Sequence, residues 1–182
     1  MSTASAVDDD VCMLAFQQGD SNSFERLVER HEAFAWRVAF GFFGDEYLAK
    51  DALQNAFLRI YIHAAKYTLR GKFTAFLKQI VIRQCLNMSR GNKPNLIADA
   101  GYVVDPRTSP SMKVARSQRW QAVREAIVSL PPIQKLALSL RYMGGQIYQE
   151  IASALGLTPK AVECLLWRAR KALTPRLEGI LE

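Results

Sequence analysis

Hydrophobic residues recur at every third or fourth position along most of the chain, which is the period of an α-helix. This period predicts helices over residues 22–42, 47–66 and 73–90. Asn22 and Glu25 have the spacing of an N-terminal capping pair at the start of the first helix. One face of that helix is formed by Phe24, Leu27, Val28, His31, Phe34, Val38 and Phe42. No convincing strand alternation occurs, so the chain is predicted to be all-α, with these three helices in one domain.

The helical pattern stops at residues 91–111 and returns at about Ser117. The interruption, GNKPNLIADAGYVVDPRTSPS, contains three prolines together with Gly, Asn, Asp and Ser. Such a composition without a sustained period is typical of a flexible linker. We therefore expect two small helical domains and a linker, at residues 10–92, 117–182 and 93–116 respectively.

The stretch YQEIASALGLTPKAVECLLWRARKAL, residues 148–173, predicts a short helix, a corner and a longer helix. Gly156 allows the corner, and Thr158 followed by Pro159 provides a side-chain cap and a fixed φ for the second helix. This is the pattern of a helix-turn-helix. In that motif the N-terminal residues of the second helix contact the edges of DNA bases, and basic residues further along the helix contact phosphates. A plain helical hairpin has the same spacing and stays open as an alternative. The candidate DNA-binding residues are Thr158, Lys160, Ala161, Glu163, Cys164, Trp167, Arg168, Arg170 and Lys171.

Charge is unevenly distributed along the chain, which has a formal net charge of +7. Residues 1–51 hold ten acidic and four basic residues, whereas residues 52–98 hold eight basic residues and no acidic one. A long block of one sign indicates a polyanion partner, with a merely solvated basic face as the alternative. Aromatic residues lie beside the bases of this block, a combination suited to unpaired nucleic acid, although most of these rings are expected to be core.

The helix predicted over residues 47–66 has two different faces at 100° per residue. The core face consists of Ala49, Leu53, Ala56, Phe57, Ile60 and Ala64. Opposite lie Asp51, Gln54, Asn55, Leu58 and Ile62. Exposed apolar groups framed by polar ones are typical of a protein interface. The alternative is that Leu58 and Ile62 pack under the linker.

Several classes of protein are disfavoured by the sequence. No apolar run reaches the roughly 18–20 residues that cross a bilayer, and MSTASAVDDD does not resemble an export signal, so a cytoplasmic protein is expected. Cys12, Cys85 and Cys164 are widely spaced and odd in number, and they are expected to be reduced thiols without a metal. We recognise no paired catalytic carboxylates and no glycine-rich phosphate loop, so we expect no enzymatic activity, cofactor or small-molecule substrate.

Several stretches resemble one known family, in the family's order, over about residues 10–178. LPPIQKLALSLRYMGGQIYQEIASALGLTPKAVECLLWRARKAL resembles region four, the promoter-binding domain of bacterial sigma factors of the extracytoplasmic-function (ECF) group of the sigma-70 family. DALQNAFLRIY resembles the core-polymerase-binding segment of region two. GKFTAFLKQIVIRQCLNMSR resembles the part of region two that melts and reads the minus-ten promoter element, and SNSFERLVERHEAFAWRVAF resembles the start of that region.

The resemblance implies a sigma factor that binds core RNA polymerase and directs promoter recognition, DNA melting and transcription initiation. The implied partners are core RNA polymerase, promoter DNA in duplex and single-stranded form, and a possible anti-sigma factor. The implied polymerase-binding residues are Asp51, Gln54, Asn55, Leu58 and Ile62. The implied minus-ten residues are Tyr67, Arg70, Lys72, Phe73, Phe76, Lys78, Arg83, Asn87 and Arg90. The helix-turn-helix at residues 148–167 would read the minus-thirty-five element, and the linker would thread through the polymerase.

Some positions depart from the family pattern, namely Lys50, Asn55, Phe76, Arg83, Asn87, Glu163 and Leu165. An acid at 163 accepts a hydrogen bond from cytosine but repels phosphate, so the minus-thirty-five sequence does not follow from relatives. Two other functions compete with the sigma-factor hypothesis. One is a dimeric helix-turn-helix regulator that works without polymerase, which leaves the Asp51 face unexplained. The other is a sigma-like decoy that holds polymerase or an anti-sigma factor without reading DNA.

Overall fold

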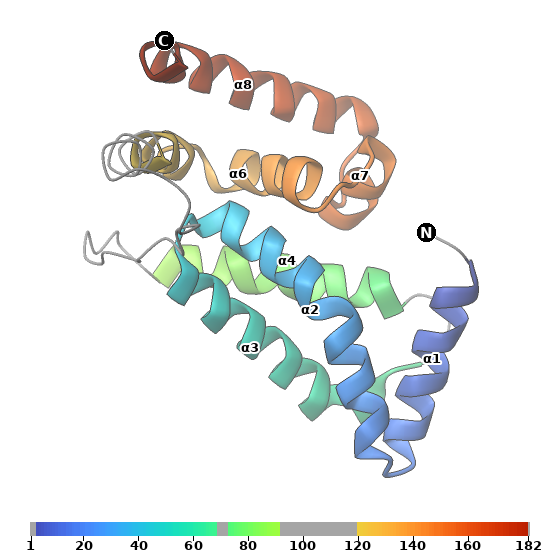
Figure 1. Cartoon of the computed structure of the whole chain (residues 1–182). Coiled ribbons are helices and arrows are strands. Elements are labelled where there is room, and N and C mark those ends of the chain that lie inside the picture. Colours follow the sequence, from blue (N-terminus) through green and yellow to red (C-terminus); the bar gives the residue numbers. More distant parts are fainter. Residues whose placement is uncertain (1–2, 69–72, 92–119, 182) are drawn as a thin grey trace.

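The computed structural model describes residues 3–68, 73–91 and 120–181 (Figure 1). Regular structure in these ranges is helical and includes no strand, which confirms the all-α prediction. The N-terminal module consists of α1 (Thr3–Gln17), α2 (Ser21–Phe43), α3 (Glu46–His63), the 3₁₀ turn η1 (Ala64–Lys66) and α4 (Phe73–Gly91). The C-terminal module consists of helical residues 120–128, α6 (Pro132–Leu138), the π-helical turn η2 (Ser139–Met143), α7 (Tyr148–Leu155) and α8 (Pro159–Leu181).

The N-terminal module packs its four α-helices around a shared apolar core. Met13, Leu27, Ile60, Phe73 and Leu77 come from all four helices and are fully buried. These residues are the inward-facing positions of the helical period, so burial of their apolar area stabilises the module. The core face predicted for the second helix is confirmed in α3 and at Ala64 of η1, and it is buried except for the half-buried Leu53.

The start of α2 differs from the expected cap. Asp20 has extended backbone dihedrals, and its carboxylate accepts hydrogen bonds from the backbone nitrogen of Asn22 at 3.1 Å and the hydroxyl of Ser23 at 2.6 Å. The prediction of an Asn22–Glu25 capping pair was therefore wrong, because the helix begins one residue earlier. Helix α1 is an addition, since the first helix described from the sequence pattern began at residue 22.

The C-terminal module contains the predicted helix-turn-helix in α7 and α8. Gly156 ends α7 with a left-handed backbone, at φ 67°, which glycine adopts without a steric cost. The Thr158 hydroxyl accepts a hydrogen bond from the backbone nitrogen of Ala161 at 3.2 Å and so caps α8. One face of α8 is buried through Val162, Leu166, Ala169 and Leu173. The opposite face remains exposed.

The two modules pack directly against each other, which the sequence pattern had not predicted. Figure 1 shows α6 and α7 lying between α8 and the N-terminal module, and α2 and α4 contact α6, η2 and α7. Gly41 permits the close approach, since a Cβ there would lie 2.6 Å from Met143 Cγ and 2.7 Å from Ser139 Oγ. The Ser139 hydroxyl donates to the backbone oxygen of Val38. We call this contact the docking interface.

Two further polar contacts cross the docking interface. The Arg37 guanidinium donates to the backbone oxygen of Met143 at 3.2 Å, and the Arg124 guanidinium is 2.9 Å from the carboxylate of Asp45. Asp45 also caps α3 by accepting from the backbone nitrogen of Leu48 at 3.0 Å. One carboxylate therefore links the corner between α2 and α3 to the second module.

Within the described ranges, no helix is both long enough and apolar enough to span a bilayer. The linker predicted at residues 93–116 lies outside the described residues.

Candidate binding surfaces

The outer face of α3 presents two large apolar side chains on a polar background. Leu58 is 52% exposed and Ile62 is 63% exposed, and the neighbouring Asp51 and Gln54 are exposed as well. Asn55 is half-buried, and its side-chain amide donates to the Asp51 backbone oxygen at 2.9 Å and to the Asp51 carboxylate at 2.7 Å. Asn55 therefore holds the carboxylate of Asp51 in place. The alternative, that Leu58 and Ile62 pack under the linker, depends on residues 93–116, which lie outside the described ranges.

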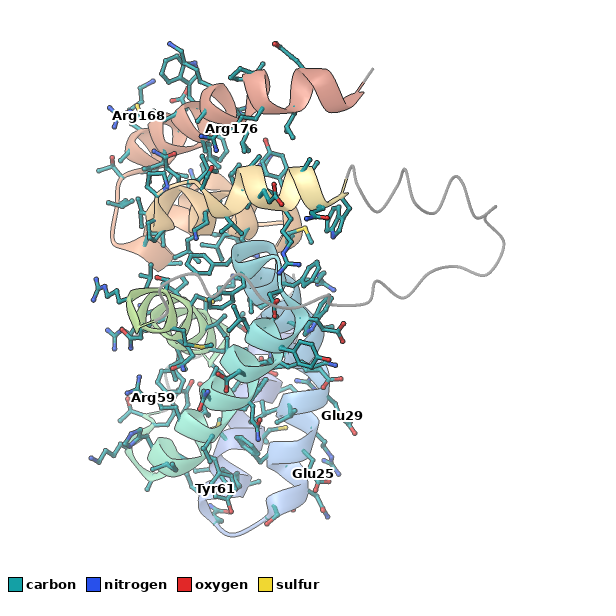
Figure 2. All side chains as sticks on the ribbon, turned by 90° about the vertical axis from the view of Figure 1, so that its left-hand side faces the viewer. Glu25, Glu29, Arg59, Tyr61, Arg168 and Arg176 are labelled. Atoms are coloured by element: carbon teal, nitrogen blue, oxygen red, sulfur yellow. The ribbon has the colours of Figure 1, made fainter. Side chains whose placement is uncertain are left out.

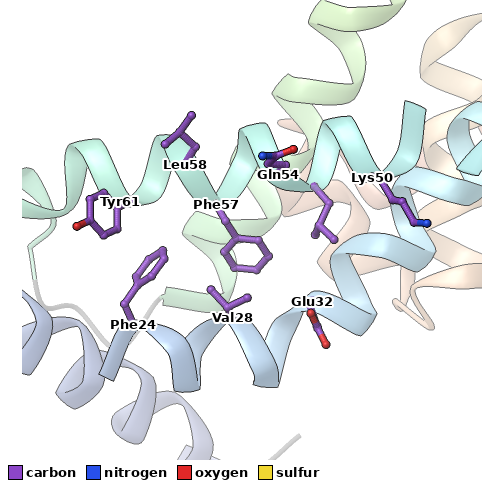
Figure 3. Close-up of a pocket in the computed structure, with 9 residues that line it drawn as sticks. Phe24, Val28, Glu32, Lys50, Gln54, Phe57, Leu58 and Tyr61 are labelled. Carbon is purple, nitrogen blue, oxygen red and sulfur yellow. The ribbon is translucent and has the colours of Figure 1, made fainter. Parts of the chain in front are cut away.

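A groove of about 530 Å³ runs between α2 and α3, beside this face (Figure 3). Phe24, Val28 and Phe57 point into the gap between the two helices, whereas Gln54 and Leu58 point away from α2 (Figure 3). Lys50, which departs from the family pattern, lines one end of the groove. Its ammonium is 2.6 Å from the Glu46 carboxylate, and this hydrogen bond raises the pKa of Lys50. The added positive charge is therefore offset by a neighbouring acid.

The residues predicted to contact unpaired DNA differ in their exposure to solvent. On α4, Arg83, Asn87 and Arg90 are exposed. Half-buried positions are occupied by Tyr67 and Phe76, whose ring centroids are 5.2 Å apart. The positions Arg70 and Lys72 lie outside the described residues.

The ring of Phe73 lies in the core and not at the surface, where contact with a DNA base would require it. It is fully buried, with its ring centroid 5.4 Å from that of His31 and 6.0 Å from that of Tyr67. The first residue of α4 faces inward because its helical position belongs to the core side. Phe73 therefore packs in the core beneath the half-buried Tyr67 and Phe76.

Lys78 lies in the docking interface instead of on an open surface. Its ammonium donates to the side-chain oxygen of Gln146 and lies 5.7 Å from the centroid of the Phe34 ring. Burial lowers the pKa of Lys78 below its ordinary value of 10.5, because the charged form loses hydration. In the docked arrangement Lys78 is thus occupied by the second module, and its predicted contact with DNA would require it to leave Gln146.

The exposed face of α8 carries most of the predicted duplex-binding residues. The exposed side chains on this face are Lys160, Glu163, Cys164, Trp167, Arg168 and Lys171. Lys160 and Glu163 form an ion pair of 2.8 Å, and the Lys171 ammonium lies 5.0 Å from the centroid of the Trp167 ring. The Lys160 ammonium lowers the pKa of Glu163, which favours the charged carboxylate. This face therefore mixes one acid and one aromatic ring with several bases.

The other members of the predicted set have different positions. Ala161 is half-buried, and Thr158 uses its hydroxyl in the cap of α8. Leu165, which departs from the family pattern and is not one of the predicted residues, is half-buried as well. Arg170 is exposed but lies on the flank of α8, where it lines a cleft of about 540 Å³ with Leu173 and Thr174. Arg170 is therefore less well placed for duplex DNA than the residues of the outer face.

Two arginines and two glutamates lie on opposite sides of the molecule. Figure 2 shows Arg59 of α3 and Arg168 of α8 projecting from one side, with Glu25 and Glu29 of α2 on the opposite side. A polyanion is attracted to the first side and repelled by the second. Each module thus has an arginine, Arg59 or Arg168, on the same side of the docked molecule.

Comparisons with known proteins identify similar families for both modules. The chain matches the family model of Sigma-70 region 2 over residues 27–94 and that of Sigma-70, region 4 over residues 120–173. It is 30% identical over 171 residues to the ECF RNA polymerase sigma factor SigM of Mycobacterium tuberculosis, covering 93% of this chain and 84% of the relative. It is 22% identical over 175 residues to the ECF RNA polymerase sigma factor SigW of Bacillus subtilis, covering 90% and 94% respectively.

A solved structure has a similar fold. This is CnrH in the structure of CnrH in complex with the cytosolic domain of CnrY, with a TM-score of 0.69 and 22% sequence identity. The match covers 94% of this chain and 98% of the CnrH chain. It therefore extends over both modules.

Proposed function

Because the chain belongs to the ECF group of the sigma-70 family, we propose that it binds core RNA polymerase through the outer face of α3, opens promoter DNA with α4 and reads upstream duplex DNA with α8. Members of this family are non-catalytic initiation factors that direct promoter recognition for transcription initiation. The bond-forming chemistry belongs to the polymerase, and this chain would work beside it in the cytoplasm.

The observation that carries the polymerase contact is the exposed apolar pair Leu58 and Ile62 on α3. Apolar side chains at the centre of a patch, with polar groups around them, form the usual core and rim of a protein interface. Asp51 and Gln54 supply the rim, and Asn55 fixes the Asp51 carboxylate. The alternative of a dimeric regulator that works without polymerase leaves the Asp51 side of this surface unexplained.

The DNA contacts are supported by the exposed bases of α4 and α8. We assign Arg83, Asn87 and Arg90 to the unpaired strand of the minus-ten element, because they are the exposed members of that set. On α8, the N-terminal residues Lys160 and Glu163 would contact the edges of DNA bases, and basic residues further along the helix would bind phosphates.

Binding both promoter elements at once requires the two modules to separate. The minus-ten and minus-thirty-five elements lie roughly 25 base pairs apart, which is about 85 Å along the duplex at 3.4 Å per base pair. A compact chain of this length has a radius of gyration of only about 16 Å. We therefore infer that the docked arrangement is a form of the free chain, and that promoter binding opens the docking interface.

Transcription with purified core polymerase tests the proposed function. Run-off products made with the chain and a genomic library are mapped by sequencing of their RNA 5′ ends. We expect start sites that depend on the chain and share two upstream sequence blocks. Co-purification with core polymerase but no specific transcripts would favour the decoy, and duplex binding without polymerase association would favour the independent regulator.

An anti-sigma factor is a further proposed partner. The support is that CnrH, whose fold is similar, was solved in complex with the cytosolic domain of CnrY. We propose that a protein of this kind holds the chain away from core polymerase. The test is to isolate the tagged chain from its own cells, identify what co-elutes, and ask whether the purified co-eluting protein blocks run-off transcription. A co-eluting protein that leaves transcription unchanged would contradict this role.

A further inference from the structure

Helix α1 contacts residues 64–67, which follow α3, and Thr74 in the first turn of α4 through three polar side chains. The first is Gln17, the last residue of α1, whose amide donates to the backbone oxygens of Ala64 at 2.8 Å and Tyr67 at 2.9 Å. The Ala64 oxygen also accepts from the backbone nitrogen of Tyr67 at 2.9 Å. One amide group thus fixes the path of the chain as it leaves α3 through η1.

The second side chain is Asp10, which holds Tyr67. The Tyr67 hydroxyl donates to the Asp10 carboxylate at 2.7 Å, and Asp10 is only 7% exposed. Burial and this hydrogen bond raise the pKa of Tyr67, so its hydroxyl stays protonated and remains a donor at neutral pH. The orientation of the Tyr67 ring, which packs beside Phe76, is thereby set from α1.

The third side chain is Asp9, which connects α2 to the start of α4. Asp9 is fully buried, with its carboxylate 2.6 Å from Arg30 Nη1, 2.8 Å from His31 Nε2 and 3.4 Å from the Thr74 hydroxyl. A buried carboxylate is tolerated only when it is paired and hydrogen-bonded. Arg30 and His31 therefore hold Asp9, and Asp9 in turn accepts from Thr74.

These contacts go beyond what attachment of α1 requires. Cys12 and Met13 already bury the apolar side of the helix in the core. The Gln17 amide and the Asp10–Tyr67 hydrogen bond are instead directed at the segment before α4, and Asp9 reaches Thr74 just after residues 69–72 in the sequence. The polar groups of α1 thus contact described residues that precede positions 69–72 and one described residue that follows them.

We propose that α1 is a positioning helix for strand recognition, in which Asp9, Asp10 and Gln17 set the conformation of residues 64–68 and 73–76 that receives the unpaired strand of an open promoter. The inference rests on the proposed function and adds residues that the sequence comparison with the family does not assign. Asp9, Asp10 and Gln17 act through Tyr67 and Thr74, so they are positioning residues and not DNA ligands.

Two matched pairs of variants test this inference. Gln17→Glu replaces the amide donor with a carboxylate, which repels the two backbone oxygens, and Gln18→Glu makes the same change at the exposed neighbouring residue. Asp10→Leu removes the acceptor of the Tyr67 hydroxyl, whereas Asp10→Asn keeps one. Each chain is bound to core RNA polymerase and mixed with fork-junction DNA whose unpaired strand is randomised, and the bound molecules are sequenced.

We expect the wild-type chain to enrich a motif in the unpaired strand. Gln17→Glu and Asp10→Leu should lower that enrichment about tenfold, the order of effect of one or two lost hydrogen bonds, while Gln18→Glu and Asp10→Asn retain it. Affinity for core polymerase and helical circular dichroism should be the same in all five chains. A loss of motif enrichment at unchanged polymerase affinity and helical content is the result that a merely structural role would not produce.

Three results would overturn the inference. The first is equal enrichment by Gln17→Glu and Gln18→Glu together with equal enrichment by Asp10→Leu and Asp10→Asn. The second is a parallel loss of helical content, polymerase affinity and enrichment in both damaging variants. In the third, the wild-type chain itself enriches no motif, and the proposed function then fails together with the inference. In the first two cases the wild-type motif remains, so the proposed function stands.

Discussion

Gly41→Ala is predicted to weaken the docking interface while it stabilises α2 itself. A Cβ at position 41 would lie 2.6 Å from Met143 Cγ, 2.7 Å from Ser139 Oγ and 3.3 Å from Ser139 Cβ. Ser139 cannot rotate away without loss, because its hydroxyl donates to the Val38 backbone oxygen. Overpacking of this kind costs about 1–3 kcal/mol, which lowers the docking equilibrium constant roughly 5- to 150-fold. Alanine inside a helix is about 1 kcal/mol better than glycine, so the two effects have opposite signs.

The assay compares Gly41→Ala with Gly91→Ala in small-angle X-ray scattering and thermal unfolding. Gly91 ends α4, and a Cβ there would have no neighbouring atom within 4 Å, so its substitution leaves the docking interface unchanged. We expect a larger radius of gyration for Gly41→Ala than for wild type or Gly91→Ala, with helical content preserved. Scattering curves of Gly41→Ala and Gly91→Ala that superimpose would refute the reasoning. A loss of helical content would instead show damage to α2.

Four other outcomes can be measured. Leu58→Asp should abolish co-purification with core polymerase at unchanged helical content, whereas Val11→Asp, at a position that is 57% exposed, should retain it; equal behaviour would remove the α3 face from the proposal. Ellman's reagent should modify one thiol per native chain, the exposed Cys164, because the other two cysteines are buried and burial raises the pKa of each; a second fast thiol would contradict this. Glu163→Gln should strengthen binding to duplex DNA and steepen its salt dependence, since a repulsive charge is lost; an unchanged salt slope would place residue 163 away from the backbone. Docking should strengthen as pH rises toward 10.5, because the docked state binds the Lys78 proton more weakly; a radius of gyration that grows over this range would contradict that sign.

Local signals predicted the elements and several exposed surfaces of this chain. The 100° periodicity of α3 placed Leu58 and Ile62 opposite the core, and both are exposed in the structure. The helix-turn-helix followed from Gly156 and from Thr158, whose backbone and capping roles depend only on adjacent residues. Such features are predictable because the atoms that decide them lie within one or two turns of the chain.

The structural features that the sequence did not predict depend on contacts between residues that are far apart in the chain. Lys78 belongs to an acid-free block and was therefore predicted to bind DNA, yet its partner Gln146 is 68 residues away. The family resemblance placed Phe73 in the minus-ten set, but its ring is buried beside His31 and Tyr67. Periodicity tells which side of a helix is buried, and it does not tell which element covers that side. The docking interface and the contacts of α1 were not predicted for this reason, since both depend on which elements pack together.

The position of Lys78 makes docking and strand binding alternative uses of one side chain. If Lys78 contacts the unpaired strand, as its place in the minus-ten set predicts, it must leave Gln146, and each event then weakens the other by the same free energy. The outer face of α3, with Leu58, stays exposed while the modules are docked. Polymerase can therefore bind the closed chain first, and DNA that takes Lys78 afterwards favours separation of the modules. Polymerase on the α3 face leaves the contacts of the docking interface in place, whereas strand binding removes the Lys78–Gln146 contact, so we expect opening to depend on the promoter.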